Sequence, residues 1–148
     1  MRVANAPGFT VRALEDSANK VDGDAWNLIR GAVQFAIEKL KPVGHLFVTV
    51  TPTDIVQGRD GIEAYGFYDS GLFHVVIAGR GRDLPEFDGD TELWLLELAT
   101  TALHEVTHYW QDTLGLIRDD YDYESEAESK VEAMLYSICH NVRELYAD

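Results

Sequence analysis

The stretch LHEVTHYWQD, residues 103–112, decides how this sequence is interpreted, because it places His104 and His108 four positions apart. Residues four apart in a helix lie about 40° from each other around the axis, so both imidazoles project from one face. The surrounding residues 91–114 are apolar over most of their length, which predicts a helix buried at the centre of the protein. We therefore expect two imidazoles to approach one another in a largely apolar environment.

Polar side chains in such a helix need a partner. Burying His104, His108 and the adjacent Glu105 without compensation would cost several kcal/mol. A bound dication offsets that cost, so the spacing predicts that both histidines are metal ligands. Glu105 lies about 100° from His104, too far to complete the ligand set but near enough to reach a water at the metal. The alternative, a structural pair of histidines satisfied by hydrogen bonds, stays open at this point.

A third ligand is expected from the last predicted helix, residues 122–146, whose first turns carry Glu124, Glu126 and Glu128. With Glu124 at zero and about 100° per residue, an apolar stripe lies within about 40° of it. Its members are Val131, Leu135, Ile138 and Val142. A carboxylate at the head of an apolar stripe is unusual unless it binds something, so Glu124 is the predicted third ligand. Glu128, at about 40°, is expected to accept a ring N–H from a ligand histidine, and Glu126, at about 200°, to be solvated.

Three protein ligands leave a fourth metal position open for water, which is the arrangement of a catalytic rather than a structural zinc. Zinc lowers the pKa of such a water to about 7, so a neighbouring carboxylate can take its proton at neutral pH. We therefore expect one zinc ion per chain, with Glu105 as the general base.

The rest of the chain predicts an α+β fold in one domain spanning residues 1–148. After a short leader, apolar residues at helical spacing predict a first helix at 22–42. Three segments of strand character, separated by Gly, Asp and Ser, follow at residues 45–52, 61–69 and 71–79. We expect a three- or four-stranded, mostly antiparallel sheet with the helices on one side, and a C-terminal helix that carries the third ligand.

The composition limits the partners and the compartment. The formal net charge is −14 and no Lys/Arg cluster is present, so no nucleic-acid partner is expected. Cys139 is the only cysteine, which excludes an internal disulfide and favours a reducing, cytoplasmic location. No signal-like or membrane-length apolar run occurs, so no membrane association is expected, and the oligomeric state stays open.

The segments HEVTH at 104–108 and ESEAE at 124–128 together resemble the gluzincin zinc metallopeptidases, of which thermolysin is the familiar large member. The chain length, and a small sheet leading into the HExxH helix, are similar to the single-domain minigluzincins and to the phage-immunity type of metallopeptidase. The resemblance implies a zincin-like fold and a zinc-dependent metallopeptidase that acts on a peptide or protein substrate. It also implies the same three ligands, general base and supporting glutamate as the spacing.

The resemblance further implies groups that contact substrate. In gluzincins the strand before the active-site helix pairs with extended substrate, which assigns that role here to residues 72–79. A Tyr or His near the third ligand usually stabilises the oxyanion, and Tyr121, Tyr123 and His140 are available. His140 would lie about 160° from Glu124, away from the apolar stripe, which argues against it. Tyr121 and Tyr123 are both plausible, and Tyr123 is the candidate catalytic residue. Either tyrosine could instead be an ordinary packing residue.

Three functions are compatible with these residues. The leading hypothesis is a zinc-dependent peptidase. The second is a zinc-binding regulatory or interaction domain of the same fold that cleaves little or nothing. The third is a metal-free interaction domain in which His104 and His108 are structural. Metal content separates the third from the others, and the effect of changing Glu105 on cleavage separates the first two.

Overall fold

The computed structural model describes residues 2–138, which contain three α-helices and seven strands. The strands are β1 (Val3–Ala6), β2 (Phe9–Ala13), β3 (Leu46–Thr51), β4 (Val56–Gln57), β5 (Glu63–Ala64), β6 (Gly66–Asp69) and β7 (His74–Ala78). The helices are α1 (Gly23–Leu40), α2 (Thr91–Thr113) and α3 (Tyr123–Ile138), with a short 3₁₀ helix at Pro85–Phe87. None of the helices within residues 2–138 is both long and apolar enough to cross a membrane. The α+β class is confirmed, whereas Cys139, His140 and Val142 lie outside the described residues.

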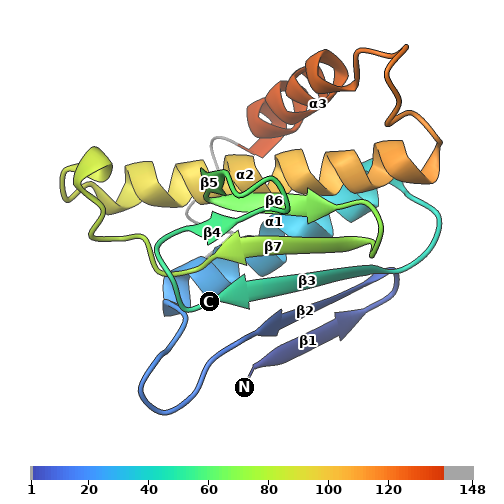
Figure 1. Ribbon diagram of the computed structural model, residues 1–148. Helices are drawn as coiled ribbons and strands as arrows, with labels where there is room; N and C mark the ends of the chain where they lie inside the picture. The colour runs from blue at the N-terminus through green and yellow to red at the C-terminus, as the bar shows by residue number, and fades with distance from the viewer. Residues whose placement is uncertain (1, 139–148) are drawn as a thin grey trace.

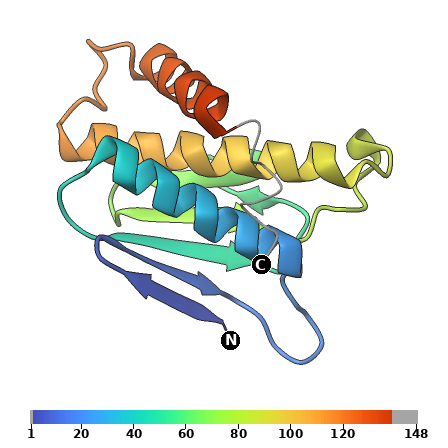
Figure 2. The same cartoon turned by 180° about the vertical axis from the view of Figure 1, so that it is seen from behind.

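The elements form layers, with α1 and α2 side by side on one face of a five-stranded sheet (Figures 1 and 2). α3 packs on α2, on the side away from the sheet (Figure 1). One hydrophobic core joins the sheet to α1 and α2, and it continues into α3 through Val131, Met134 and Ile138. α2 contacts both other helices as well as β6 and β7, as expected for a buried helix at residues 91–114.

The main sheet is mixed, in the order β1-β2-β3-β7-β6. Its outer pairs, β1–β2 and β6–β7, are antiparallel, whereas β2–β3 and β3–β7 are parallel. A separate antiparallel pair joins β4 to β5, so three of the five pairings between described strands are antiparallel. Parallel neighbours need a crossover connection, and α1 supplies it between β2 and β3. The strand pairings are therefore mostly antiparallel, as expected from the sequence, whereas the centre of the main sheet is parallel.

The expectation that a leader precedes the first helix, and that the sheet has three or four strands, is wrong. Residues 3–13 form the hairpin β1–β2, which brings the main sheet to five strands. Gly8 turns the chain between them with φ at +92°, a conformation that favours glycine. The sequence contained a signal for the second of these strands, because Phe9, Val11 and Ala13 alternate with polar residues. In the structure all three side chains are buried.

The strand expected to pair with substrate, residues 72–79, lies inside the sheet. β7 is hydrogen-bonded to β3 on one side and to β6 on the other, so it has no free edge for an added strand. The break predicted between the segments 61–69 and 71–79 is confirmed as a hairpin turn, which returns the chain from β6 to β7. β6, at one end of the strand order, is instead the edge strand on this side of the sheet. The sequence could not predict this, because the order of two hairpin strands along the chain does not show which of them pairs with a third strand.

One arginine joins the starts of the two helices that cover the sheet. Asp22 caps α1 and Asp90 caps α2 through side-chain oxygens that accept backbone N–H groups. Arg82 donates to both carboxylate oxygens of Asp22, at 2.8 and 3.0 Å, and to the Thr91 hydroxyl at 3.0 Å. This fork-shaped contact holds the start of α2, and thus the helix with the two histidines, against α1.

Gly66 allows β6 to lie directly against α2. A Cβ atom at this position would lie 2.7 Å from the Thr101 side chain and 3.0 Å from the Val76 backbone oxygen. We predict that Gly66→Ala lowers the free energy of unfolding by about 1–3 kcal/mol in urea denaturation, because the added methyl group overpacks the contact. Gly23→Ala is the control, since a Cβ there meets no atom within 4 Å. It should leave stability unchanged or slightly raised, and equal losses in both variants would contradict the close-approach role.

Candidate metal centre

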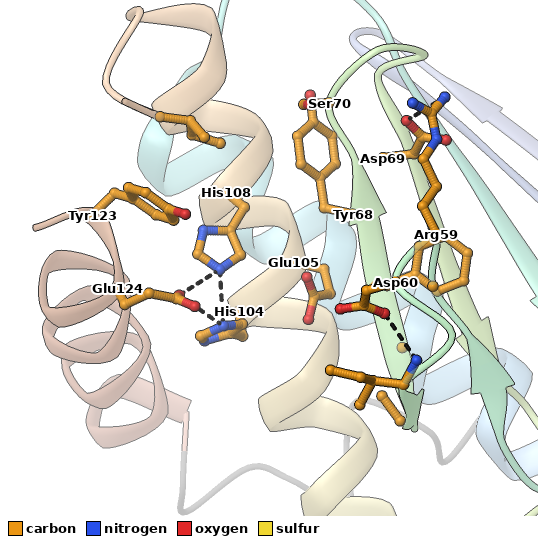
Figure 3. Close-up of a pocket in the computed structure, with 16 residues that line it drawn as sticks. Arg59, Asp60, Tyr68, Asp69, Ser70, His104, Glu105, His108, Tyr123 and Glu124 are labelled. Carbon is orange, nitrogen blue, oxygen red and sulfur yellow. Dashed lines mark hydrogen bonds and ion pairs between the residues drawn. The ribbon is translucent and has the colours of Figure 1, made fainter. Parts of the chain in front are cut away.

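His104 and His108 lie on adjacent turns of α2 and point into the same space (Figure 3). Their Nε2 atoms are 2.9 Å apart, and the rings meet edge to face with centroids 4.5 Å apart. Burial, followed by the neighbouring His108, lowers the pKa of His104, and nearby glutamates oppose this shift. A lowered pKa favours the neutral imidazole, which is the form that binds a metal.

Glu124, in the first turn of α3, completes the group. Its Oε1 lies 2.9 Å from His108 Nε2 and 3.6 Å from His104 Nε2, and Figure 3 shows its carboxylate turned toward both rings. Ligand atoms about 2.0–2.1 Å from a zinc ion, at the tetrahedral angle, lie about 3.3 Å from one another. The three observed separations differ from that value by only a few tenths of an ångström. Two imidazoles and one carboxylate could therefore hold a divalent cation here.

A buried glutamine that the sequence interpretation missed supports His108. Gln111, one turn later on α2, is fully buried, and its Oε1 lies 2.8 Å from His108 Nδ1. Its amide nitrogen donates to the Tyr123 carbonyl oxygen at 2.7 Å and to Glu126 at 3.0 Å. The sequence could have indicated this contact, because Gln111 follows His108 by three positions and residues three apart on a helix are neighbours. Gln111 thus links a candidate ligand on α2 to the turn of α3 that carries Glu124.

Two glutamates of α3 lie differently from the sequence expectation. Glu126 is half-buried rather than fully solvated, and it accepts hydrogen bonds from the buried glutamine amide and, at 2.6 Å, from the Tyr121 hydroxyl. Glu128 is exposed and forms no hydrogen bond with either histidine within residues 2–138. The buried residues of α3 are Ala127, Val131, Met134 and Ile138. Around the helix axis, the mean direction of these four residues lies about 50° from Glu124, on the side away from Glu128. Glu128 is therefore turned away from the buried face, toward solvent.

Glu105 lines the same cavity as the three donor residues. Burial, and then the Glu124 carboxylate, raise the pKa of Glu105 to about 8, and a hydrogen bond from the Tyr68 backbone N–H opposes the rise. A nearby cation would act in the opposite direction, because it favours the ionised carboxylate. Glu105 is therefore placed to exchange a proton in the neutral range with a group in the cavity.

The two tyrosines near Glu124 differ in what their hydroxyls do. Tyr121 donates its hydroxyl to Glu126 at 2.6 Å, so this group ties the loop before α3 to the first turns of that helix. Tyr123 lies against His108, with ring centroids 5.8 Å apart, and lines the cavity (Figure 3). Of these two tyrosines, Tyr123 is thus the one that could contact a bound molecule.

The donor residues open into a cavity of about 510 Å³. Its opposite wall is formed by β6 and by the loop at residues 58–62 (Figure 3). The Ala78 N–H donates to the carbonyl of Tyr65, the residue just before β6, at 2.8 Å. In an antiparallel pair only every second residue bonds to the neighbouring strand, so from Tyr65 onward it is the odd-numbered residues that bond to β7. Gly66 and Tyr68 consequently direct their backbone groups away from β7. The cavity is therefore bordered by an edge strand that no other strand pairs on its outer side within residues 2–138.

Five of the six predicted site residues line this cavity together. They are His104, Glu105, His108, Tyr123 and Glu124. The structure does not bring Glu128 into the group, and it adds Gln111 behind His108. Comparisons with protein-family models, curated proteins and solved structures give no match to this chain.

Proposed function

We propose that this protein is a zinc-dependent metallopeptidase of the gluzincin type, with one zinc ion held by His104, His108 and Glu124. The observation that carries the proposal is the convergence of three donor atoms, 2.9–3.6 Å apart, beside Glu105 in an open cavity. Two histidines and one glutamate are a ligand set of catalytic zinc in peptidases. Electron-rich atoms at such separations repel one another unless a proton or a cation lies between them, which supports a bound cation.

The residues of the chain divide the work of peptide hydrolysis. Bound zinc would supply a Lewis acid that polarises the substrate carbonyl and acidifies a water molecule. Glu105 would accept a proton from the attacking water and return it to the leaving amine. Tyr123 would donate its hydroxyl to the substrate oxygen on which negative charge develops.

We assign the binding of extended peptide to β6. This edge strand borders the cavity, so a peptide can add beside it through backbone hydrogen bonds. The Tyr68 backbone N–H, which points away from β7, donates to Glu105. A peptide laid along this edge would therefore pass directly beside the proposed general base.

The metal content of the protein tests this proposal. After purification without chelator and reconstitution with zinc, we expect about one zinc ion per chain. At free zinc about 100-fold above Kd, the free energy of unfolding should rise by about 2.7 kcal/mol, and a chelator should reverse the rise. Absence of stoichiometric zinc would contradict the proposal and support the metal-free interaction domain. Profiling cleavage of a denatured proteome with and without chelator then tests the peptidase activity.

A further inference from the structure

We propose that Gln111 is the positioning residue of this metal centre. It holds His108 with Nδ1 protonated and Nε2 free to bind a metal, and it fixes the turn of α3 that carries Glu124. The inference rests on the proposed zinc site and extends it by a residue outside the ligand set. Three hydrogen bonds of this one buried side chain carry it.

The partners of the Gln111 amide determine its orientation. One end of the amide lies 2.7 Å from the Tyr123 carbonyl oxygen and 3.0 Å from Glu126 Oε1. A backbone carbonyl can only accept a hydrogen bond, so the amide nitrogen must lie at this end, with both hydrogens used. The Oε1 atom of Gln111 then faces His108 Nδ1 at 2.8 Å and can only accept.

This orientation selects one tautomer of His108. An accepting oxygen opposite Nδ1 requires the proton to be on Nδ1, so in the neutral ring Nε2 keeps its lone pair. Glu124 Oε1, 2.9 Å from this Nε2, is also an acceptor, so without a metal the proton near both atoms has to come from His104 Nε2, which lies 2.9 Å from Nε2 and 3.6 Å from Oε1. Nε2 is the atom that lies 2.9 Å from both His104 Nε2 and Glu124 Oε1. Gln111 thus presents to the site the nitrogen that a metal would bind, before a metal arrives.

The same amide couples the donor residues of the two helices. Both of its hydrogens go to the first turn of α3, at Tyr123 and Glu126. The Glu124 side chain is 61% exposed, so its own packing holds it only weakly. Its distance from the imidazoles therefore depends on where α3 sits against α2, and Gln111 is a buried polar tie between them.

The tautomer can be tested in the metal-free wild-type protein by ¹⁵N NMR of the imidazoles, recorded at rising pH until the ring shifts no longer change. We expect His108 to show a protonated Nδ1 and an unprotonated Nε2. A ring protonated on Nε2, or a mixture of the two tautomers, would overturn the proposal. The measurement needs neither zinc nor a variant, so its outcome does not depend on the proposed activity.

Zinc titration of two variants tests the positioning role. Gln111→Met keeps the length of the side chain but removes its amide, and it should weaken zinc binding by about 10–100-fold. The double variant Gln111→Glu, Glu126→Gln keeps an acceptor for His108 and a hydrogen bond between the two exchanged side chains. It should recover the Nδ1-protonated tautomer and part of the affinity, because a carboxylate oxygen at position 111 would face the Tyr123 carbonyl oxygen, which cannot donate a hydrogen bond to it.

The outcomes separate this inference from the proposed function. If wild-type protein binds zinc and Gln111→Met binds it equally tightly, the positioning role is refuted and the zinc site stands. If the double variant binds as weakly as Gln111→Met, an acceptor at position 111 is not what the site requires, and the inference is again refuted. Wild-type protein that binds no zinc refutes the proposed function. Should Gln111→Met fail to fold, the double variant and the wild-type spectrum decide.

Discussion

Glu105→Gln is expected to reduce kcat/KM for peptide cleavage by about 10²–10⁴-fold, the usual contribution of a general base. The amide preserves the size of the side chain but cannot take a proton from water. Glu105 is outside the group of three converging donor residues, so zinc content should stay the same. Cleavage of a peptide library and zinc content should be measured on the same preparation of each protein.

Glu132→Gln is the matched control, because it makes the same chemical change at an exposed position of α3. It should alter neither readout. Wild-type cleavage rates in Glu105→Gln would rule out Glu105 as the general base. If zinc-loaded wild-type protein itself cleaves nothing, the zinc-binding regulatory or interaction domain becomes the better-supported function.

Glu124→Ala is expected to weaken zinc binding by more than about 100-fold, because losing a ligand should exceed the 10–100-fold cost of losing an outer partner. Its side chain is 61% exposed, so the thermal midpoint of the metal-free protein should stay close to that of wild type. Calorimetric titration, or competition with a chromophoric chelator, would measure the affinity.

Glu128→Ala provides the comparison for this prediction. It removes the same carboxylate one turn later, from an exposed side chain without a hydrogen bond to either histidine within residues 2–138. Surface charges contribute about 0–1 kcal/mol, so the loss of zinc affinity should be less than about fivefold. Equal losses in both variants would indicate general electrostatic attraction. A loss only in Glu128→Ala would show that the third ligand is misassigned.

The part of the candidate site that the sequence predicted lies within single helices. The expected helix at 91–114 corresponds to α2, and the four-residue spacing of His104 and His108 alone places their rings together. The choice of Glu124 among three neighbouring glutamates followed from the apolar stripe of its helix, and the structure brings Glu124 to the two rings. Each of these predictions needs only the 3.6-residue period of one helix.

The features that could not be predicted depend on contacts between elements. β6, and not β7, borders the cavity as an edge strand, because β3 pairs with the second strand of the hairpin. Gln111 and Glu126 meet because α3 returns across α2, and the stripe of α3 alone had assigned Glu126 to solvent. Neither result follows from residues that are close in the sequence.

By itself, the sequence determined which side chains share a helix face and therefore which two imidazoles and which carboxylate could meet. Only the tertiary structure decided which strand presents a free edge to them, and which buried amide sets the proton on His108. Helical periodicity is a local property of the backbone, whereas strand order and the partners of a buried polar group depend on the packing of segments far apart in the chain.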